Sequence, residues 1–170
     1  MRILQTIDKG DYTSDMPVYE KYTVRGVILR DGKIAVQQSK DGDYKILGGG
    51  VDPGESLTDA LLREVQEESG LIVMEDTIRP VGEIVEKRRD IFDPSMIYLC
   101  HSCFFFCDVK AQMTAMHMTE SEKEKGFRLV WATPEEILKG NEPFCETQPW
   151  SYRDREFVRI LPELLGEQDA

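Results

Sequence analysis

The chain has 170 residues, of which 41% are hydrophobic, and a formal net charge of −11 at pH 7. This length and composition predict a single globular domain over residues 1–170, with a fold of the α/β (α+β) class. The strong negative charge argues against a protein that grips nucleic acid through its phosphates, but it allows a small phosphate ligand if bound metal ions supply positive charge.

No run of about 18 apolar residues occurs, so no membrane span is expected. The start, MRILQTIDKGDYTSDMP, lacks the apolar core and the small-residue cleavage site of a secretory signal. We therefore expect a cytoplasmic protein, and the sequence is compatible with a homodimer.

The first predicted elements form a hairpin within residues 22–39, YTVRGVILRDGKIAVQQS, whose two apolar runs are joined by Asp31-Gly32. Asp-Gly between such runs is a strong turn signal. YKIL then leads into a glycine-rich loop, and a helix is predicted over residues 57–69. Ser56 and Asp59 resemble a capping box at its start, and Gly70 is suited to its end.

The second half of the chain predicts two strands, near residues 80–89 and 96–109, followed by a polar connection over residues 113–126. FRLVWA, residues 127–132, is a further strand, and Thr133-Pro134 marks a new helix start. The last helix carries a hydrophobic stripe at helical spacing: Phe157, Val158, Ile160, Leu161, Leu164 and Leu165. Together these elements predict a mixed β-sheet sandwiched between helices.

Three of the four cysteines crowd into YLCHSCFFFCDV, where Cys100 and Cys103 have the spacing of a zinc or redox motif. The run is rich in strand formers, and residues three apart in a strand point to opposite faces. Buried free thiols are therefore expected.

The predicted helix over residues 57–69 carries three carboxylates on one face, because Glu64, Glu67 and Glu68 are related by i, i+3 and i+4. None of them has a basic residue four positions ahead, so the repulsion between them has no evident counter-charge. Hard divalent cations prefer converging oxygen ligands. The pattern indicates a metal site, and we expect these side chains to face a wet site and not the core.

The stretch Gly49–Leu71 resembles the Nudix box, G-x5-E-x7-R-E-U-x-E-E-x-G-U, in which U is a bulky apolar residue. Every defined position is filled: Gly49, Glu55, Arg63, Glu64, Val65, Glu67, Glu68, Gly70 and Leu71. The order of strands and helices around the box also resembles the Nudix fold. The resemblance implies an enzyme that uses Mg²⁺ or Mn²⁺ to hydrolyse a nucleoside diphosphate linked to another group.

The resemblance assigns roles by position. Glu64, Glu67 and Glu68 match metal ligands, one of which serves as base, and Gly48 matches a residue whose carbonyl often binds metal. Arg63 resembles the arginine that orients the carboxylates, and Glu55 the acid that supports them. Leu47 departs from the pattern, since many relatives have proline before the glycine pair.

Several residues outside the box are weaker candidates. Glu120, Glu122 and Glu124 are candidates for a distal acid, although a solvated loop explains each equally well. Arg25, Tyr44 and Trp131 could contact a base or sugar, although a structural role is commoner for such strand residues. TQPWS, residues 147–151, resembles a signature of NADH-cleaving relatives, but it lies far downstream of the box and is interpreted as coincidence.

The predicted function is therefore a metal-dependent Nudix pyrophosphohydrolase acting on a small nucleotide, nucleotide sugar or dinucleotide. The alternative is a Nudix-like sensor that binds a nucleotide without cleaving it. The intact box argues against the sensor and against diphosphate isomerase chemistry, and the acidic charge argues against RNA decapping.

Overall fold

The structure is a computed structural model that describes residues 1–168. Its strands are β1 (Ile3–Asp8), β2 (Val18–Val27), β3 (Leu29–Arg30), β4 (Lys33–Gln38), β5 (Tyr44–Ile46), β6 (Leu71–Val73), β7 (Arg79–Arg89), β8 (Ile97–Phe106), β9 (Val109–Met113) and β10 (Arg128–Ala132). Its helices are α1 (Leu57–Ser69), α2 (Glu120–Glu124), α3 (Pro134–Asn141) and α4 (Pro149–Gln168), with 3-10 turns at Glu75–Thr77 and Glu142–Phe144.

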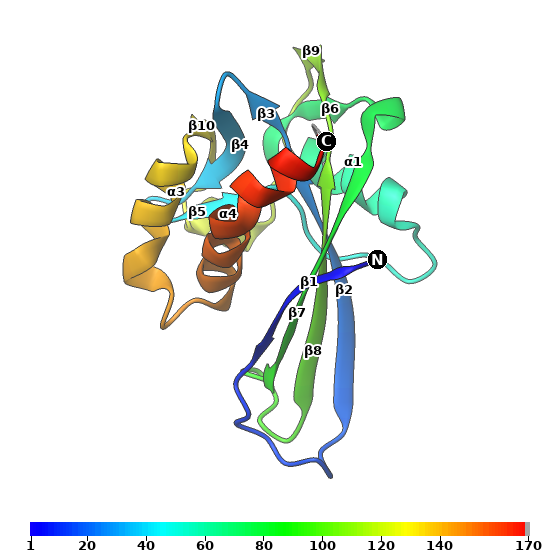
Figure 1. Ribbon diagram of the computed structural model, residues 1–170, viewed down its shortest axis with the longest axis vertical. Coiled ribbons are helices and arrows are strands. Elements are labelled where there is room, and N and C mark those ends of the chain that lie inside the picture. Colours follow the sequence, from blue (N-terminus) through cyan, green and yellow to red (C-terminus); the bar gives the residue numbers. More distant parts are fainter. Residues whose placement is uncertain (169–170) are drawn as a thin grey trace.

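The strands are divided among three sheets. The largest has the order β1-β7-β8-β2, in which β7 and β8 are antiparallel while β1 and β2 run parallel to their neighbours. The second has the order β10-β4-β3, with β5 also paired to β4, and β6 pairs with β9. Helices lie on both sides of the strands, α1 on one and α3 and α4 on the other (Figure 1). The predicted fold class is confirmed.

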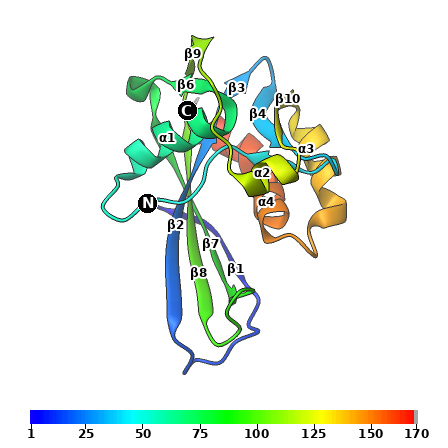
Figure 2. The same cartoon turned by 180° about the vertical axis from the view of Figure 1, so that it is seen from behind.

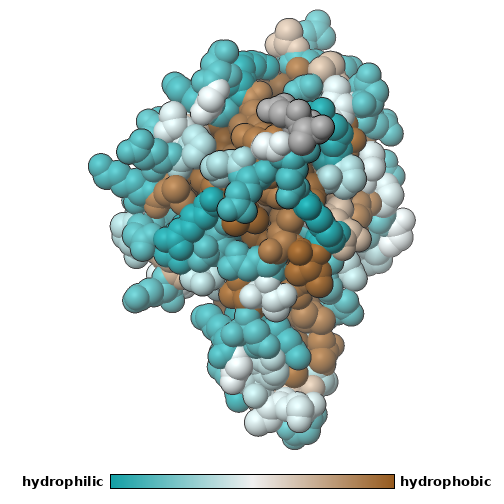
Figure 3. Space-filling model, viewed as in Figure 1, coloured by the Kyte–Doolittle hydropathy of each residue, from teal (hydrophilic) through white to brown (hydrophobic). Residues whose placement is uncertain are grey.

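The β1-β7-β8-β2 sheet extends beyond the part of the molecule that the helices cover. In both ribbon views, the ends of β1, β2, β7 and β8 reach beyond the helices as a separate sheet extension (Figures 1 and 2). A band of apolar residues follows one side of this extension (Figure 3). Exposed large apolar side chains here include Val18, Tyr19, Ile91 and Phe92, of which Phe92 is 91% exposed.

Two hydrophobic cores hold the body together. One joins α3 and α4 to the sheets, and in it the rings of Phe104 and Phe157 stack 3.9 Å apart. The other lies beneath α1 and contains Leu61 and Val65. Leu47, which replaces the proline of many relatives, is fully buried in this second core. Its side chain therefore anchors the start of the glycine-rich loop.

Several predicted boundaries are confirmed. The helix over residues 57–69 is α1, where Ser56 Oγ accepts a hydrogen bond from Asp59 N and Gly70 ends the helix at φ 74°. Thr133 caps α3 in a full capping box with Glu136. The stripe of α4 packs into the first core, with its residues buried or partly buried there.

The hairpin prediction is correct only at its turn. Asp31 and Gly32 adopt φ of 51° and 74°, as a two-residue hairpin turn requires. However, of the first predicted run only β3 pairs with β4, because residues 18–27 form β2 beside β8. Sequence periodicity cannot show which neighbour a buried strand selects.

Three further features differ from the sequence predictions. The strand expected over residues 96–109 ends at Phe106, and the chain then leaves this sheet so that β9 can pair with β6. The connection over residues 113–126 contains α2, which is too short for helical periodicity and is held by a capping box of Thr119 and Glu122. β1 was not predicted at all.

All four cysteines are free and buried, as predicted. Over residues 1–168, no helix combines the length and the apolar character that crossing a bilayer requires.

Candidate active site

Arg63 organises the carboxylates at the start of the site. Its Nε and Nη2 donate to the two oxygens of Glu55 at 2.8 Å each, and Nη1 donates to Glu64 Oε1 at 2.7 Å. Nη1 also lies 3.5 Å from Glu67 Oε2, and Nη2 donates to the Gly50 carbonyl at 3.0 Å. The hydrogen bonds from Arg63 are the main reason that the pKa of Glu55 is lowered to about 2. One guanidinium thus links the loop to three glutamates.

Glu68 occupies a different environment, because it is only 2% exposed. Its Oε2 accepts from Gly48 N at 2.8 Å, and its Oε1 accepts from Lys45 Nζ at 2.5 Å. Burial raises the pKa of Glu68 to about 7, although Lys45 opposes the shift. Glu68 is therefore far more buried than the sequence predicts, although it still lines the cavity described below.

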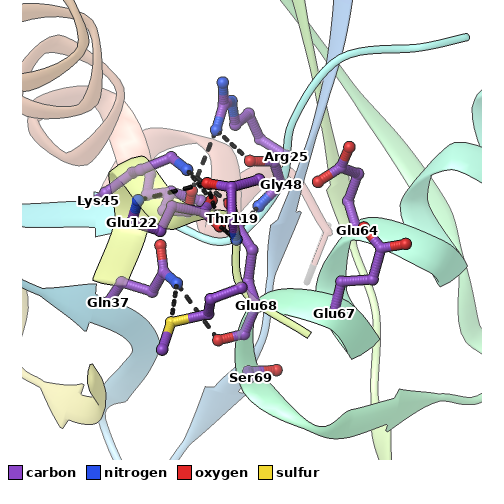
Figure 4. Close-up of polar contacts among 12 residues, drawn as sticks. Arg25, Gln37, Lys45, Gly48, Glu64, Glu67, Glu68, Ser69, Thr119 and Glu122 are labelled. Carbon is purple, nitrogen blue, oxygen red and sulfur yellow. Dashed lines mark hydrogen bonds and ion pairs between the residues drawn. The ribbon is translucent and has the colours of Figure 1, made fainter. Parts of the chain in front are cut away.

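The expectation that these glutamates have no counter-charge is wrong. Arg63 contacts Glu64 and Glu67, and Lys45 from β5 contacts Glu68. Arg63, which the Nudix resemblance already implied as the orienting arginine, lies four positions before Glu67, so a comparison with residues four positions ahead does not find it. Lys45 lies on another element, and no sequence signal pointed to it. Figure 4 shows Glu68 turned toward Lys45 and Glu122, with Glu64 and Glu67 on the other flank of the helix.

Of the three candidate distal acids, the structure brings one to the site. Glu122 Oε1 lies 3.7 Å from Lys45 Nζ, so Lys45 lies between Glu68 and Glu122 (Figure 4). Glu120 pairs with Lys123 on the surface, and Glu124 is exposed. The capping box that builds α2 also directs Glu122, since its Oε2 accepts from Thr119 N.

The glycines of the loop let its backbone lie close to β2 and to the Glu64 carboxylate. A Cβ on Gly48, whose φ is 140°, would lie 1.9 Å from the Val24 carbonyl oxygen. A Cβ on Gly49 would lie 2.4 Å from Glu64 Oε2. Glycine at 48 therefore lets the loop pack on β2, and glycine at 49 leaves room for the Glu64 carboxylate.

The candidate substrate residues separate into two groups. Arg25 is buried beside the loop, where its Nη1 donates to the Gly48 carbonyl at 2.7 Å. Tyr44 lies elsewhere, in a surface depression beside Gly140. Trp131 packs at the edge of the second core with the Arg30 guanidinium 4.8 Å from its ring. Only Arg25 therefore shares a cavity with the glutamates.

That cavity has a volume of about 580 Å³ and is lined by Glu64 and Glu68 together with residues 48–50. Its walls carry six basic side chains, although the protein as a whole is strongly acidic: Lys21, Arg25, Lys45, Arg88, Lys125 and Arg153. Phe127, Pro149 and Trp150 also line it. Pro149 and Trp150 belong to the TQPWS segment interpreted above as coincidence, and their position shows that this segment borders the cavity.

The donor set suits a hard divalent cation, since Glu64, Glu67, Glu68 and the Gly48 carbonyl offer only oxygen. The space that Gly49 leaves for the Glu64 carboxylate is a second observation that agrees with a cation site. In the described part of the chain, however, no three acidic, histidine or cysteine side chains are close enough to enclose an ion. Arg63 and Lys45 now hold the glutamates, so metal binding would require these ion pairs to rearrange.

Comparisons with known proteins agree with this architecture. A family model described as the NUDIX domain matches residues 21–154. The CTP pyrophosphohydrolase of Escherichia coli (strain K12) is 34% identical over 121 residues, which are 68% of this chain and 78% of that protein.

Solved structures show the same fold at lower identity. The E. coli ORF135 protein superposes with a TM-score of 0.54 at 24% identity, covering 90% of this chain and 96% of that one. The MutT protein of Methanosarcina mazei Go1 gives a TM-score of 0.57 at 17% identity, covering 93% and 100%. The fold is thus that of MutT-like proteins. The chain belongs to the Nudix family of hydrolases, as the box predicted.

Proposed function

We propose that this enzyme is a divalent-metal-dependent pyrophosphohydrolase that cleaves the diphosphate linkage of a nucleoside diphosphate joined to another group. The observation that carries the proposal is one cavity whose lining combines Glu64, Glu68 and the Gly48 loop with six basic side chains. Such a cavity offers cation ligands and phosphate-binding groups together. The name of the E. coli relative, a CTP pyrophosphohydrolase, agrees with this reaction class.

In this proposal Glu64, Glu67, Glu68 and the Gly48 carbonyl hold Mg²⁺ or Mn²⁺. The bound cation would neutralise the diphosphate and lower the pKa of a water molecule. Arg63 keeps Glu64 and Glu67 on one flank of α1, and Glu55 fixes Arg63 in turn. One of the glutamates accepts the proton of the attacking water, and water adds across the P–O–P bond to give two phosphate products.

The basic residues have a separate task. Arg25 and Lys45 place positive charge beside the Gly48 loop, where a diphosphate would lie, and charged hydrogen bonds to phosphate are among the strongest available to proteins. Glu122 is the acid from outside the box that supports this region, through Lys45. Tyr44 has no part in the proposal because it lies outside the cavity.

The test is hydrolysis of nucleoside triphosphates, nucleotide sugars and dinucleotides, with products separated by chromatography. We expect turnover with Mg²⁺ or Mn²⁺, none in EDTA, and recovery when metal is added back. Full turnover in metal-free buffer would contradict the metal site. Tight nucleotide binding without products from any substrate would favour the sensor instead.

A further inference from the structure

The floor of the active-site cavity is one face of the β1-β7-β8-β2 sheet. On it, Tyr19, Tyr98 and Arg88 are paired across β2, β8 and β7, and Lys21, Cys100 and Glu86 form the next row. Residues with a spacing of two along a strand share a face and lie about 6.6 Å apart. Arg88 is therefore three rows, or about 20 Å of strand, from the row of Arg25 and the Gly48 loop.

Two guanidinium groups at this floor have unused donors. Arg88 is 8% exposed and Arg153, from α4, is 4% exposed, and both line the cavity. Arg88 Nε and Arg153 Nη2 are buried without a hydrogen-bond partner. Arg88 stacks on Tyr98, with its guanidinium carbon 4.2 Å from the ring centroid, and Nη1 donates to the Arg89 carbonyl. Buried donors without acceptors are rare in folded proteins because each loses its hydration.

The carboxylates nearby do not satisfy these donors. Asp154 accepts from Arg153 Nε at 2.8 Å and from Ile46 N, so it is already engaged. Asp90 accepts from the backbone of its own turn. Glu86 is buried, which raises its pKa, while the charges of Arg153 and Arg88 oppose the shift. It nevertheless makes no ion pair within 4.0 Å among residues 1–168.

Arg88 is thus a nearly buried cation that Glu86 attracts only from beyond 4.0 Å, and its Nε has no acceptor among residues 1–168. A buried guanidinium without a close acceptor is unfavourable, and a bound anion would supply that acceptor. Guanidinium groups match phosphate particularly well, since their planar fork donates two parallel hydrogen bonds. Lys21, one row nearer to the loop on the same face, reaches the loop instead, since its Nζ lies 3.8 Å from the position of a Cβ on Gly50.

We infer that Arg88 and Arg153 form a second anion subsite that binds a phosphate group of the substrate separate from the diphosphate at the glutamates. The inference rests on the proposed function for the position of that diphosphate. The extra phosphate is an ester remote from the diphosphate, as on a ribose of a phosphorylated dinucleotide, because adjacent phosphates of a nucleoside triphosphate share one oxygen and cannot span three rows of the sheet.

The subsite itself can be tested without catalysis. Inorganic phosphate is titrated into the protein in EDTA by calorimetry, so that no metal draws the anion to the glutamates. We expect saturable binding, weakened about tenfold or more in Arg88→Gln, because a charged hydrogen bond is lost. Arg79→Gln is the matched control, since Arg79 is an exposed residue of the same strand outside the cavity. Absence of binding, or equal binding by the two variants, overturns the inference.

Arg88→Lys keeps the charge but not the fork, so its affinity should lie between wild type and Arg88→Gln. Thermal melts check that each variant is folded, and Arg153→Lys replaces Arg88→Gln if the latter is unfolded. The same intermediate weakening is then expected, and wild-type affinity in Arg153→Lys overturns the inference.

The phosphate ester is tested with matched substrates in Mg²⁺, NADP⁺ against NAD⁺, with CTP against CDP as the control pair because the extra phosphate of CTP is in line. We expect kcat/KM to favour NADP⁺ over NAD⁺ about tenfold. Arg88→Gln should remove that preference through KM while kcat changes little. Hydrolysis of NADP⁺ and NAD⁺ without preference overturns the inference but leaves the proposed function intact. Phosphate binding in EDTA with no hydrolysis of any pair supports the subsite and contradicts the proposed function.

Discussion

The two walls of the cavity are built in opposite ways. The acidic wall comes from one continuous stretch, in which loop residues 48–50 and helix α1 supply both the carboxylates and the arginine that holds them. The basic floor gathers Lys21, Arg88 and Arg153 from β2, β7 and α4, which are far apart in sequence. A site whose residues are close together in the sequence can be recognised as a motif. A site whose residues are far apart in the sequence can be recognised only in the folded structure. We expect substitutions in the acidic wall to lower kcat and those in the floor to raise KM.

The largest effect is expected for Glu68→Gln, which should lower kcat by about 10²–10⁴ because a preorganised charge is lost from the transition state. The fold should persist, since the glutamine oxygen can still accept the hydrogen bond from Gly48 N. Steady-state kinetics and a thermal melt measure both outcomes. Glu124→Gln, at an exposed position on α2, is the control. Wild-type kcat in Glu68→Gln would remove Glu68 from the acidic wall.

Substitutions at two glycines of the loop separate the effect of steric space from the effect of backbone conformation. Gly49→Ala should leave stability nearly unchanged but lower kcat by up to about 10², because the new Cβ displaces the Glu64 carboxylate. Gly54→Ala should instead lower stability and leave kcat nearly unchanged. Gly54 has open space around it but a φ of 77°, so alanine there costs about 1–2 kcal/mol of stability. Equal kcat in the two variants would show that the Glu64 position is unimportant.

The burial of Glu68 predicts a pH dependence in metal-free protein. The native state holds this proton up to a pKa of about 7, whereas the unfolded chain releases it near 4.5. The native state therefore binds more protons in this window, and its stability should fall as the pH rises from about 4.5 to about 7. At 1.36 kcal/mol per unit, the Glu68 contribution is at most about 3 kcal/mol.

Denaturant unfolding in EDTA across this range isolates the contribution as the difference between wild type and Glu68→Gln. The variant should lack this component of the slope. Parallel slopes would mean that Glu68 is ionised in the native state throughout, in contact with Lys45.

The smallest effect is expected for Glu67→Gln. Its 3.5 Å contact with Arg63 and its repulsion from neighbouring glutamates nearly cancel on a surface that is partly exposed, so in EDTA its stability should match wild type within about 0.5 kcal/mol. With millimolar Mg²⁺ the wild type should gain more, because a ligand of the native state stabilises it. Equal increases in Tm for both proteins would exclude Glu67 as a ligand.

These two walls also show what the sequence could reveal. Helix α1, its caps and its glutamates were predicted because their signals lie within a few residues of one another. Lys45 was missed because its partner, Glu68, lies 23 residues away on another element. Arg88 was missed because an arginine in an alternating strand is ordinarily a solvated residue. Trp150 was quoted but set aside, since distance along the chain said nothing about distance in space.

The parallel pairing of β1 with β7 and of β2 with β8 has a consequence for the order of folding. Neither β1 nor β2 can find its neighbour until residues 79–106 have been synthesised, and such distant pairings form slowly. Helix α1, by contrast, needs only local residues for its caps. On a nascent chain, helix α1 with its glutamates can therefore form first, and the β1-β7-β8-β2 sheet pairs later. Arg153 joins the cavity only when α4 docks.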